Sequence, residues 1–317
     1  MVLPHQAGNL ATDDADRSWP VECSGPAFQL TEMFGSIYAS HPDVLRQSLR
    51  ELTTGKETDD PALALEALQR AYVRLLGIPE IGFRLRAMYF SRALAHRPSP
   101  HRVLDAGCGI GAYSLMLARR YPLAEVVGCD IDKTKTAFCN ELRDEIGLAN
   151  VRFVEADVTD LADVRGQFDL ILCIDVLEHV EDYRAALASF HRVLGPEGDL
   201  YVHVPRANQE RLFRRFDHWQ LASHVRDGFS GENLAWDFQQ AGFDVERVTP
   251  TFGFLGKLAW ELNHLTLQWN LGVAGAVFPM LFALAGLDHR LRSDHGLGLL
   301  ITARKSQNRR VVSEALA

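Results

Sequence analysis

Three glycines at alternate positions, Gly107, Gly109 and Gly111, mark the stretch of this 317-residue chain with the clearest chemistry. They follow a short apolar run at 103–104, which favours a buried strand, and they precede a predicted helix over 112–120. Glycines let the backbone turn sharply and leave no side chain between it and a ligand. The N–H groups that begin the helix point into the same gap. The spacing therefore predicts a turn that binds a nucleotide-like molecule.

Two classes of ligand compete for such a turn. Gly107, Gly109 and Ala112 satisfy the loose dinucleotide motif, so the glycines alone leave NAD open. Asp105 decides between them, because a carboxylate at the end of the first strand repels a pyrophosphate and attracts a cation such as the ammonium group of a methionyl moiety. The pattern Asp-x-Gly-x-Gly-x-Gly resembles motif I of the class I S-adenosylmethionine (SAM) methyltransferases. The resemblance implies SAM as cofactor, bound by Asp105 and all three glycines.

Later strand ends carry the rest of the predicted cofactor site. Asp130 ends a predicted strand at 124–129, where an acid can accept hydrogen bonds from both ribose hydroxyls, although it also suits a simple turn. Ile131 would then lie against the adenine. The resemblance implies adenine contacts for the pair after the third strand (151–156), and a cofactor contact where the fourth strand (168–174) ends. These positions are Asp157, Val158 and Ile174.

An arginine before the first strand completes the expected cofactor set. In the resembling ubiquinone-pathway O-methyltransferases, an arginine at about this distance before motif I binds the SAM carboxylate. Arg86 is the nearest match and Arg84 the next. A solvated helix face is the alternative, since exposed arginines are common.

Acid–base residues follow the fourth and fifth strands, where the methyl group must point. Asp175, Glu178 and His179 would share one face of a helix that began at Asp175, and His203 and His224 lie further along. Such a face suits a divalent cation, with His224 as a distant fourth ligand. The resembling ubiquinone O-methyltransferases share the Leu-Glu-His-Val run, which also occurs in family members without a metal role. We predict His179 and His224 as catalytic residues and no metal.

The alternation of apolar runs with helical patterns predicts the fold. Helices are expected at 112–120, 133–146, 180–193 and 231–241, a fifth strand at 198–204, a sixth at 243–248 and a last at 298–303. With the resemblance, this is an α/β, Rossmann-like, doubly wound seven-stranded sheet with an antiparallel last strand, N-terminal helices and a helical insert before the last strand. The expected organisation is a disordered N-terminus (1–27), a helical cap (28–97), the methyltransferase domain (98–304) with an apolar insert (252–294), and a polar tail (305–317).

The insert contains an uncharged segment, 265–287, that is long enough to be a membrane span. Its polar residues, glycines and central Pro279 weaken that interpretation, and so does the final strand, which must return to the sheet. A helix pair that forms an apolar lid or lies on a bilayer surface, and a plain extension of the core, remain alternatives.

Composition limits the partners and the compartment. A net charge of −8 argues against a nucleic-acid surface, and five cysteines without a C-x-x-C pair indicate a reducing cytosol. We therefore predict a cytoplasmic protein, with peripheral membrane contact through 265–287 left open and no indication of oligomeric state.

The predicted function is a SAM-dependent methyltransferase for a small-molecule or lipid-like acceptor, with oxygen as the preferred acceptor atom. The alternatives are methylation at carbon or nitrogen, and a SAM-binding subunit without activity of its own.

Overall fold

The computed structural model describes residues 81–216, 224–269, 271–291 and 293–306, and the structural statements below concern these residues. The predicted disordered N-terminus (1–27), most of the predicted cap (28–97) and the tail beyond residue 306 lie outside them.

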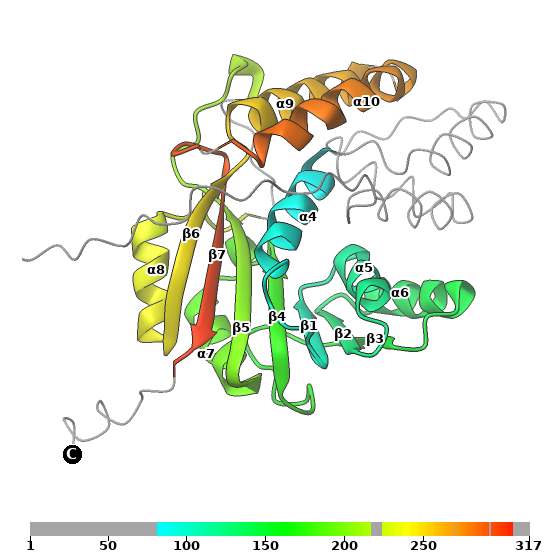
Figure 1. The fold of residues 1–317 in the computed structure, drawn as a ribbon, viewed down its shortest axis with the longest axis vertical. Coiled ribbons are helices and arrows are strands. Elements are labelled where there is room, and N and C mark those ends of the chain that lie inside the picture. The colour runs from blue at the N-terminus through cyan, green and yellow to red at the C-terminus, as the bar shows by residue number, and fades with distance from the viewer. Residues whose placement is uncertain (1–80, 217–223, 270, 292, 307–317) are drawn as a thin grey trace, which may run out of the picture.

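A mixed sheet with strand order β3-β2-β1-β4-β5-β7-β6 forms the centre of the described chain (Figure 1). Strands β1 to β5 pair in parallel, whereas β7 runs antiparallel to both of its neighbours, β5 and β6. The predicted fold class, seven strands with an antiparallel last strand, is therefore confirmed. The strands are β1 (Arg102–Ala106), β2 (Glu125–Asp130), β3 (Val151–Glu155), β4 (Phe168–Ile174), β5 (Leu194–Pro205), β6 (Phe243–Thr251) and β7 (Gly298–Lys305).

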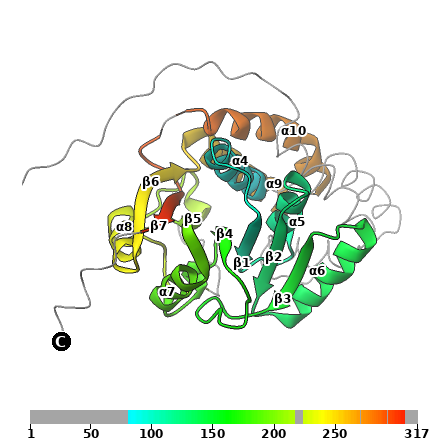
Figure 2. The same ribbon diagram turned by 60° about the horizontal axis from the view of Figure 1, so that its bottom comes forward.

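Helices cover both faces of the sheet, because successive strand residues point to opposite sides. Val103 lies in one apolar core with α4, α5, α9 and α10, while its neighbour Leu104 lies in the other with α7 and α8 (Figure 2). The helices are α4 (Ile81–Leu94), α5 (Ala112–Arg120), α6 (Lys133–Ile146), α7 (Tyr183–Val193), α8 (Gly231–Gln240), α9 (Phe254–Trp269) and α10 (Leu271–Asp288).

The helix predicted at 180–193 begins later than expected. A single 3-10 turn, Leu177–His179, follows β4, and α7 starts only at Tyr183. The carboxylate of Asp182 accepts a hydrogen bond from the Ala185 N–H at 3.0 Å and so caps the helix at that point. The residues before the cap are thereby free to form the wall of a site.

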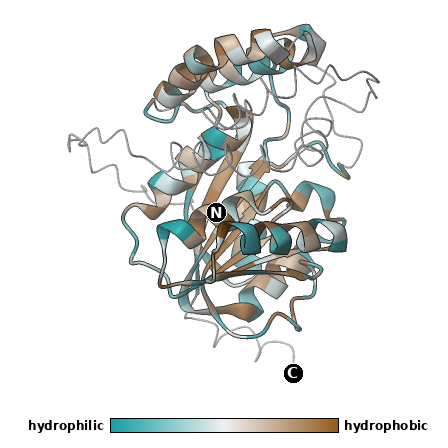
Figure 3. Ribbon diagram, turned by 90° about the vertical axis from the view of Figure 1, so that its right-hand side faces the viewer, coloured by the Kyte–Doolittle hydropathy of each residue, from teal (hydrophilic) through white to brown (hydrophobic). Residues whose placement is uncertain are grey.

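The insert between β6 and β7 is a pair of helices, α9 and α10, packed against each other and against α4. Phe278 is buried and belongs to the core, with the Arg84 guanidinium 4.7 Å from its ring centre. Trp269 and Met280 are 80% and 64% exposed, so the pair also carries outward apolar side chains. In Figure 3, brown apolar stretches run along the ribbon of the helices at the top of the view. None of the helices in the described part of the chain combines the length and apolarity needed to cross a bilayer.

Candidate functional site

The glycine turn between β1 and α5 has a backbone that favours glycine. Gly107 has φ +77°, and a Cβ there would lie 2.4 Å from a methyl carbon of Val176. Gly109 has φ +55°, and a Cβ added there would meet nothing within 4 Å, so its open side faces free space. The N–H groups of Gly107 and Cys108 both donate to the Cys129 carbonyl at 2.8 Å, which ties the turn to the end of β2.

Asp130 joins the turns that follow the first two strands. One carboxylate oxygen accepts from the Gly109 N–H at 2.9 Å, and the other accepts from the Asp132 N–H at 3.0 Å. The next residue, Ile131, is 71% exposed. An acid and an exposed apolar side chain thus lie together at the carboxyl edge of the sheet, where ligands of open α/β folds bind.

Asp105 lies beneath the turn. Its side chain is buried, and the Ser114 hydroxyl donates to it at 2.6 Å. Burial raises the pKa of Asp105 to about 6, against the opposing effect of the hydrogen bonds from Ser114.

A cavity of about 400 Å³ opens beside the turn. Six of the predicted site residues line it: Arg86, Gly107, Gly109, Ile174, His179 and His224. The other six do not form its wall: Asp105, Gly111, Asp130, Ile131, Asp157 and Val158. Arg84, the second arginine candidate, stacks on aromatic rings of α10 instead.

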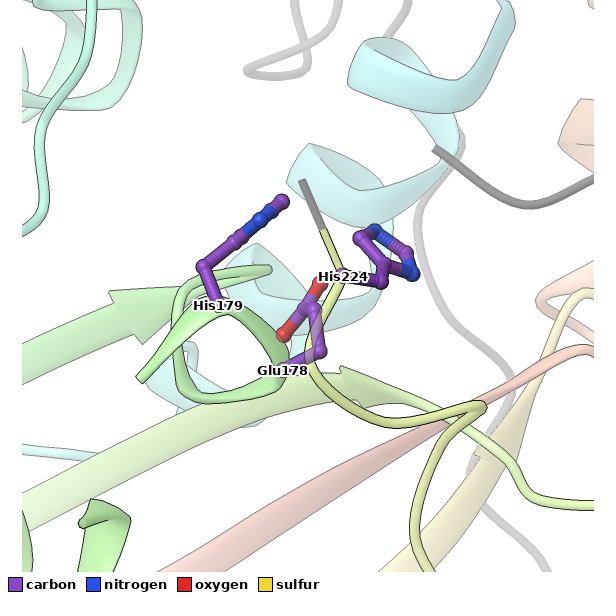
Figure 4. Close-up of side chains that lie close together, drawn as sticks. All are labelled: Glu178, His179 and His224. Atoms are coloured by element: carbon purple, nitrogen blue, oxygen red, sulfur yellow. The ribbon is translucent and has the colours of Figure 1, made fainter. Parts of the chain in front are cut away.

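A carboxyl group and two imidazoles meet at one side of this cavity. Candidate ligand atoms of Glu178, His179 and His224 all lie within 4.8 Å of one another, and the two imidazole centres are 4.7 Å apart. Figure 4 shows the three side chains rising from two neighbouring segments, the turn after β4 and the loop before α8. The set brings both predicted catalytic histidines together and suits proton transfer or a divalent cation.

Arg226 is the residue that brings the two segments together. Its guanidinium donates to the carbonyl oxygens of Leu177 and Val180 at 3.0 and 2.8 Å, while the Val225 N–H donates to the Glu178 carbonyl at 3.0 Å. His224 is therefore held beside the turn after β4.

Burial sets the charge of the cluster. Glu178 is 1% exposed, and within the described residues its Oε2 has no hydrogen-bond partner. Burial, with a further contribution from Asp175, raises the pKa of Glu178 well above its usual range. Burial and the neighbouring His179 lower the pKa of His224. The imidazole of His224 is thus neutral near pH 7 and able to accept a proton.

Asp175 belongs to a different group of side chains, because no helix begins there. It has φ +53°, pairs with Arg86 at 2.5 Å, and contacts Nδ1 of His203. The other ring nitrogen of His203 lies 2.9 Å from the Thr251 hydroxyl. Burial acts to raise the pKa of Asp175, but Arg86 and His203 outweigh it and bring the pKa to about 2. The condition for a common face of Asp175, Glu178 and His179, a helix that begins at Asp175, is therefore not met.

Aromatic residues complete the cavity wall. Phe83 and Tyr113 lie near the glycine turn, while Phe252 and Trp260 come from the end of β6 and from α9. Sequence reasoning passed over them because an isolated aromatic residue in an apolar pattern is usually core. The four residues come from α4, α5, the end of β6 and α9, and only the fold brings these elements to one cavity.

Comparison with known proteins identifies relatives of this arrangement. The model of a family described as a methyltransferase domain matches residues 82–248. A demethylmenaquinone methyltransferase of Thermus thermophilus is 39% identical over 109 residues, which cover 34% of this chain and 49% of that protein. A ubiquinone biosynthesis O-methyltransferase of Pseudomonas aeruginosa is 32% identical over 108 residues, which cover 34% of this chain and 45% of that protein. The chain thus spans less than half the length of these curated relatives.

Among solved structures, the cyclase SpnF superposes with a TM-score of 0.53 at 19% identity, over 88% of this chain and 97% of its own. At that identity the likeness shows the fold alone, and the cyclase indicates that the fold does not fix the reaction.

Proposed function

The chain belongs to the methyltransferase domain family, and on this premise we propose that it binds SAM and transfers the methyl group to a small-molecule acceptor. The observation that carries the proposal is the Glu178, His179 and His224 cluster in the same cavity as the open glycine turn.

The residues present fit SAM. Gly109 leaves an open, side-chain-free wall at the cavity, and Asp130 and Ile131 stand beside it at the end of β2. A ribose would pair with Asp130, an adenine would lie on Ile131, and the methionyl carboxylate would meet Arg86. We keep the remaining predicted contacts as part of this proposal: Asp105, Gly107, Gly111, Asp157, Val158 and Ile174.

When bound, SAM supplies a methyl group already activated by a positive sulfur. The protein must then orient the acceptor, exclude water and remove a proton. His224, kept neutral by burial, accepts the proton of an acceptor hydroxyl, with His179 next to it as the alternative base. The raised pKa of Glu178 favours its protonated form, which lies beside the two imidazoles.

Oxygen is the acceptor atom that we propose, because a hydroxyl needs the base that this cluster offers. The relatives' names include a ubiquinone biosynthesis O-methyltransferase and a demethylmenaquinone methyltransferase, and a carbon or nitrogen acceptor is the alternative. A lipid-like acceptor agrees with the apolar α9–α10 pair.

Metal-assisted transfer is a second candidate, favoured by the closeness of the same three side chains. Glu178, His179 and His224 would hold the cation, which would lower the pKa of an acceptor hydroxyl. A SAM-binding subunit without activity is the candidate from another class.

The test combines calorimetry with labelled methyl transfer. We expect SAM and its product S-adenosylhomocysteine (SAH) to bind and NAD not to bind. Label should pass from SAM to a component of aqueous or lipid extracts of the source cells. In His179→Ala and His224→Ala, transfer should fall while SAH affinity stays within about twofold. Binding without transfer to any fraction would favour the subunit, and NAD binding in place of SAM would overturn the proposal.

A further inference from the structure

A buried carboxylate fixes the segment after β5 to helix α9. Glu261 is fully buried on α9, and its oxygens accept hydrogen bonds from the N–H groups of Leu212 at 2.9 and 3.1 Å and Phe213 at 2.8 Å. Burying a carboxylate is costly unless hydrogen bonds replace its water, and here backbone donors do so. The main chain of this segment therefore has a defined place on α9.

Aromatic packing reinforces the attachment. Phe216 is fully buried, with its ring centre 5.9 Å from that of Trp260 and 6.5 Å from that of His264. The guanidinium of Arg211 lies 5.0 Å from the Trp260 ring centre. Arg211 and Trp260 both line the cavity, as does Gln209. Helix α9 thus supplies one part of the wall and holds the segment that supplies the next.

The cations of the described wall come from different elements: Arg86 from α4, Lys135 from α6 beside the end of β2, and Arg211 from the segment packed on α9. Arg211 is therefore the cation on the α9 side of the cavity. Stacking on Trp260 uses the face of the guanidinium, whereas its N–H donors lie in the plane and match a carboxylate. Asp227 also lines the cavity, but from the loop before α8.

We propose that the α9 side of the cavity is a carboxylate subsite of the methyl acceptor, in which Arg211 binds the acid and Glu261 is the positioning residue that holds Arg211 in place. The assignment of the bound acid as methyl acceptor rests on the proposed function. Binding of a carboxylate at this place does not depend on the proposed function, so the subsite and the proposed function can fail separately.

The first test uses benzoate and its neutral isostere benzamide as probes. Both are titrated against SAH-loaded protein and followed by saturation-transfer NMR. Wild type should bind benzoate at least about fivefold more tightly than benzamide, and Arg211→Gln should remove that preference, because it deletes a charged hydrogen bond. Arg214→Gln is the matched control, since Arg214 is an exposed arginine of the same segment outside the wall, and it should retain the preference.

The second test addresses Glu261. In Glu261→Gln an amide N–H₂ can face the N–H donors of Leu212 and Phe213, so we expect faster hydrogen exchange at these two amides and about 5- to 10-fold weaker benzoate binding. Glu261→Asp keeps the charge, so it should recover part of the exchange protection and part of the benzoate affinity. The control Glu232→Gln, at an exposed position on α8, should change neither the exchange rates nor the benzoate affinity. If Glu261→Gln does not fold, the Glu261→Asp variant is used for the test. It should show the same changes in amide exchange and benzoate affinity, but smaller.

The outcomes separate the two proposals. Equal binding of benzoate and benzamide, absence of benzoate binding, or a preference that survives Arg211→Gln overturns the subsite. Unchanged exchange and benzoate affinity in both Glu261 variants overturn the positioning role. Failure of wild type to bind SAH counts against the proposed function instead.

Discussion

Alanine at Gly109 is expected to separate the stability of the fold from cofactor binding. Gly109 and Gly147 both have left-handed backbones, φ +55° and +68°, and a Cβ added at either position would meet no atom within 4 Å. An L-residue in this conformation costs roughly 1–2 kcal/mol. Each alanine variant should therefore lower the free energy of unfolding by about that amount, or the melting temperature by roughly 2–8 °C.

Only one of the two positions faces the cavity. Gly109 lines it, whereas Gly147 is exposed at the end of α6. A methyl group at Gly109 would occupy space that we assign to SAM, and overpacking of this kind costs about 1–3 kcal/mol. SAH affinity, measured by calorimetry, should fall about 5- to 150-fold in Gly109→Ala and stay within about twofold in Gly147→Ala. Equal SAH affinities in the two variants, with equal losses of stability, would refute the proposal that the glycine turn contacts the cofactor.

Three further predictions concern charge, metal and membrane. Because burial raises the pKa of Asp105 from 3.8 to about 6, the folded state binds the proton more tightly than the unfolded one. Wild type should therefore lose roughly 2–3 kcal/mol relative to Asp105→Asn as the pH rises from about 4 to about 7, measured by urea unfolding; parallel pH curves would contradict this. We expect dialysis against EDTA to leave methyl transfer unchanged, and loss of activity restored by Mg²⁺, Mn²⁺ or Zn²⁺ would instead favour the metal version of the Glu178 cluster. Replacing exposed Trp269 and Met280 by serine should lower flotation with anionic liposomes at nearly unchanged stability, whereas Phe278→Ser should cost about 3–5 kcal/mol of unfolding free energy because Phe278 is buried. Equal flotation of wild type and the double variant would contradict membrane contact through these two exposed side chains.

Elements with local signals were predictable from the sequence. The helix predicted at 133–146 has those bounds in the structure, because Asp132 accepts hydrogen bonds from the N–H groups of Thr134 and Lys135 at its start and Gly147 ends it in a left-handed conformation. The strand at 168–174 is confirmed for a similar reason, since its residues from Leu170 to Ile174 form a continuous buried apolar run. Caps and apolar runs act within a few residues, so one sequence suffices to read them.

The start of α7 was harder to predict. The apolar pattern continues from Val180 into the helix, but Asp182 provides the cap and so moves the first helical residue to Tyr183. A capping carboxylate competes with the helix that would run through it. The residues that drop out of the predicted helix, 180–182, directly follow the 3-10 turn that carries Glu178 and His179. The local misprediction therefore lies next to the candidate site.

The proposed acceptor side of the cavity could not be predicted because side-chain-to-backbone hydrogen bonds assemble it. Arg226 binds carbonyl groups 49 and 46 residues away, and Glu261 binds N–H groups 49 and 48 residues away. Every residue has a backbone carbonyl and nearly every residue has a backbone N–H. The amino-acid type at a position therefore does not reveal whether its backbone is the partner of a distant side chain. The proposed cofactor side, in contrast, needs glycines and acids at fixed spacing. We therefore expect substitutions on the segments held by Arg226 and Glu261 to change the proposed acceptor while the motif that identifies the family stays intact.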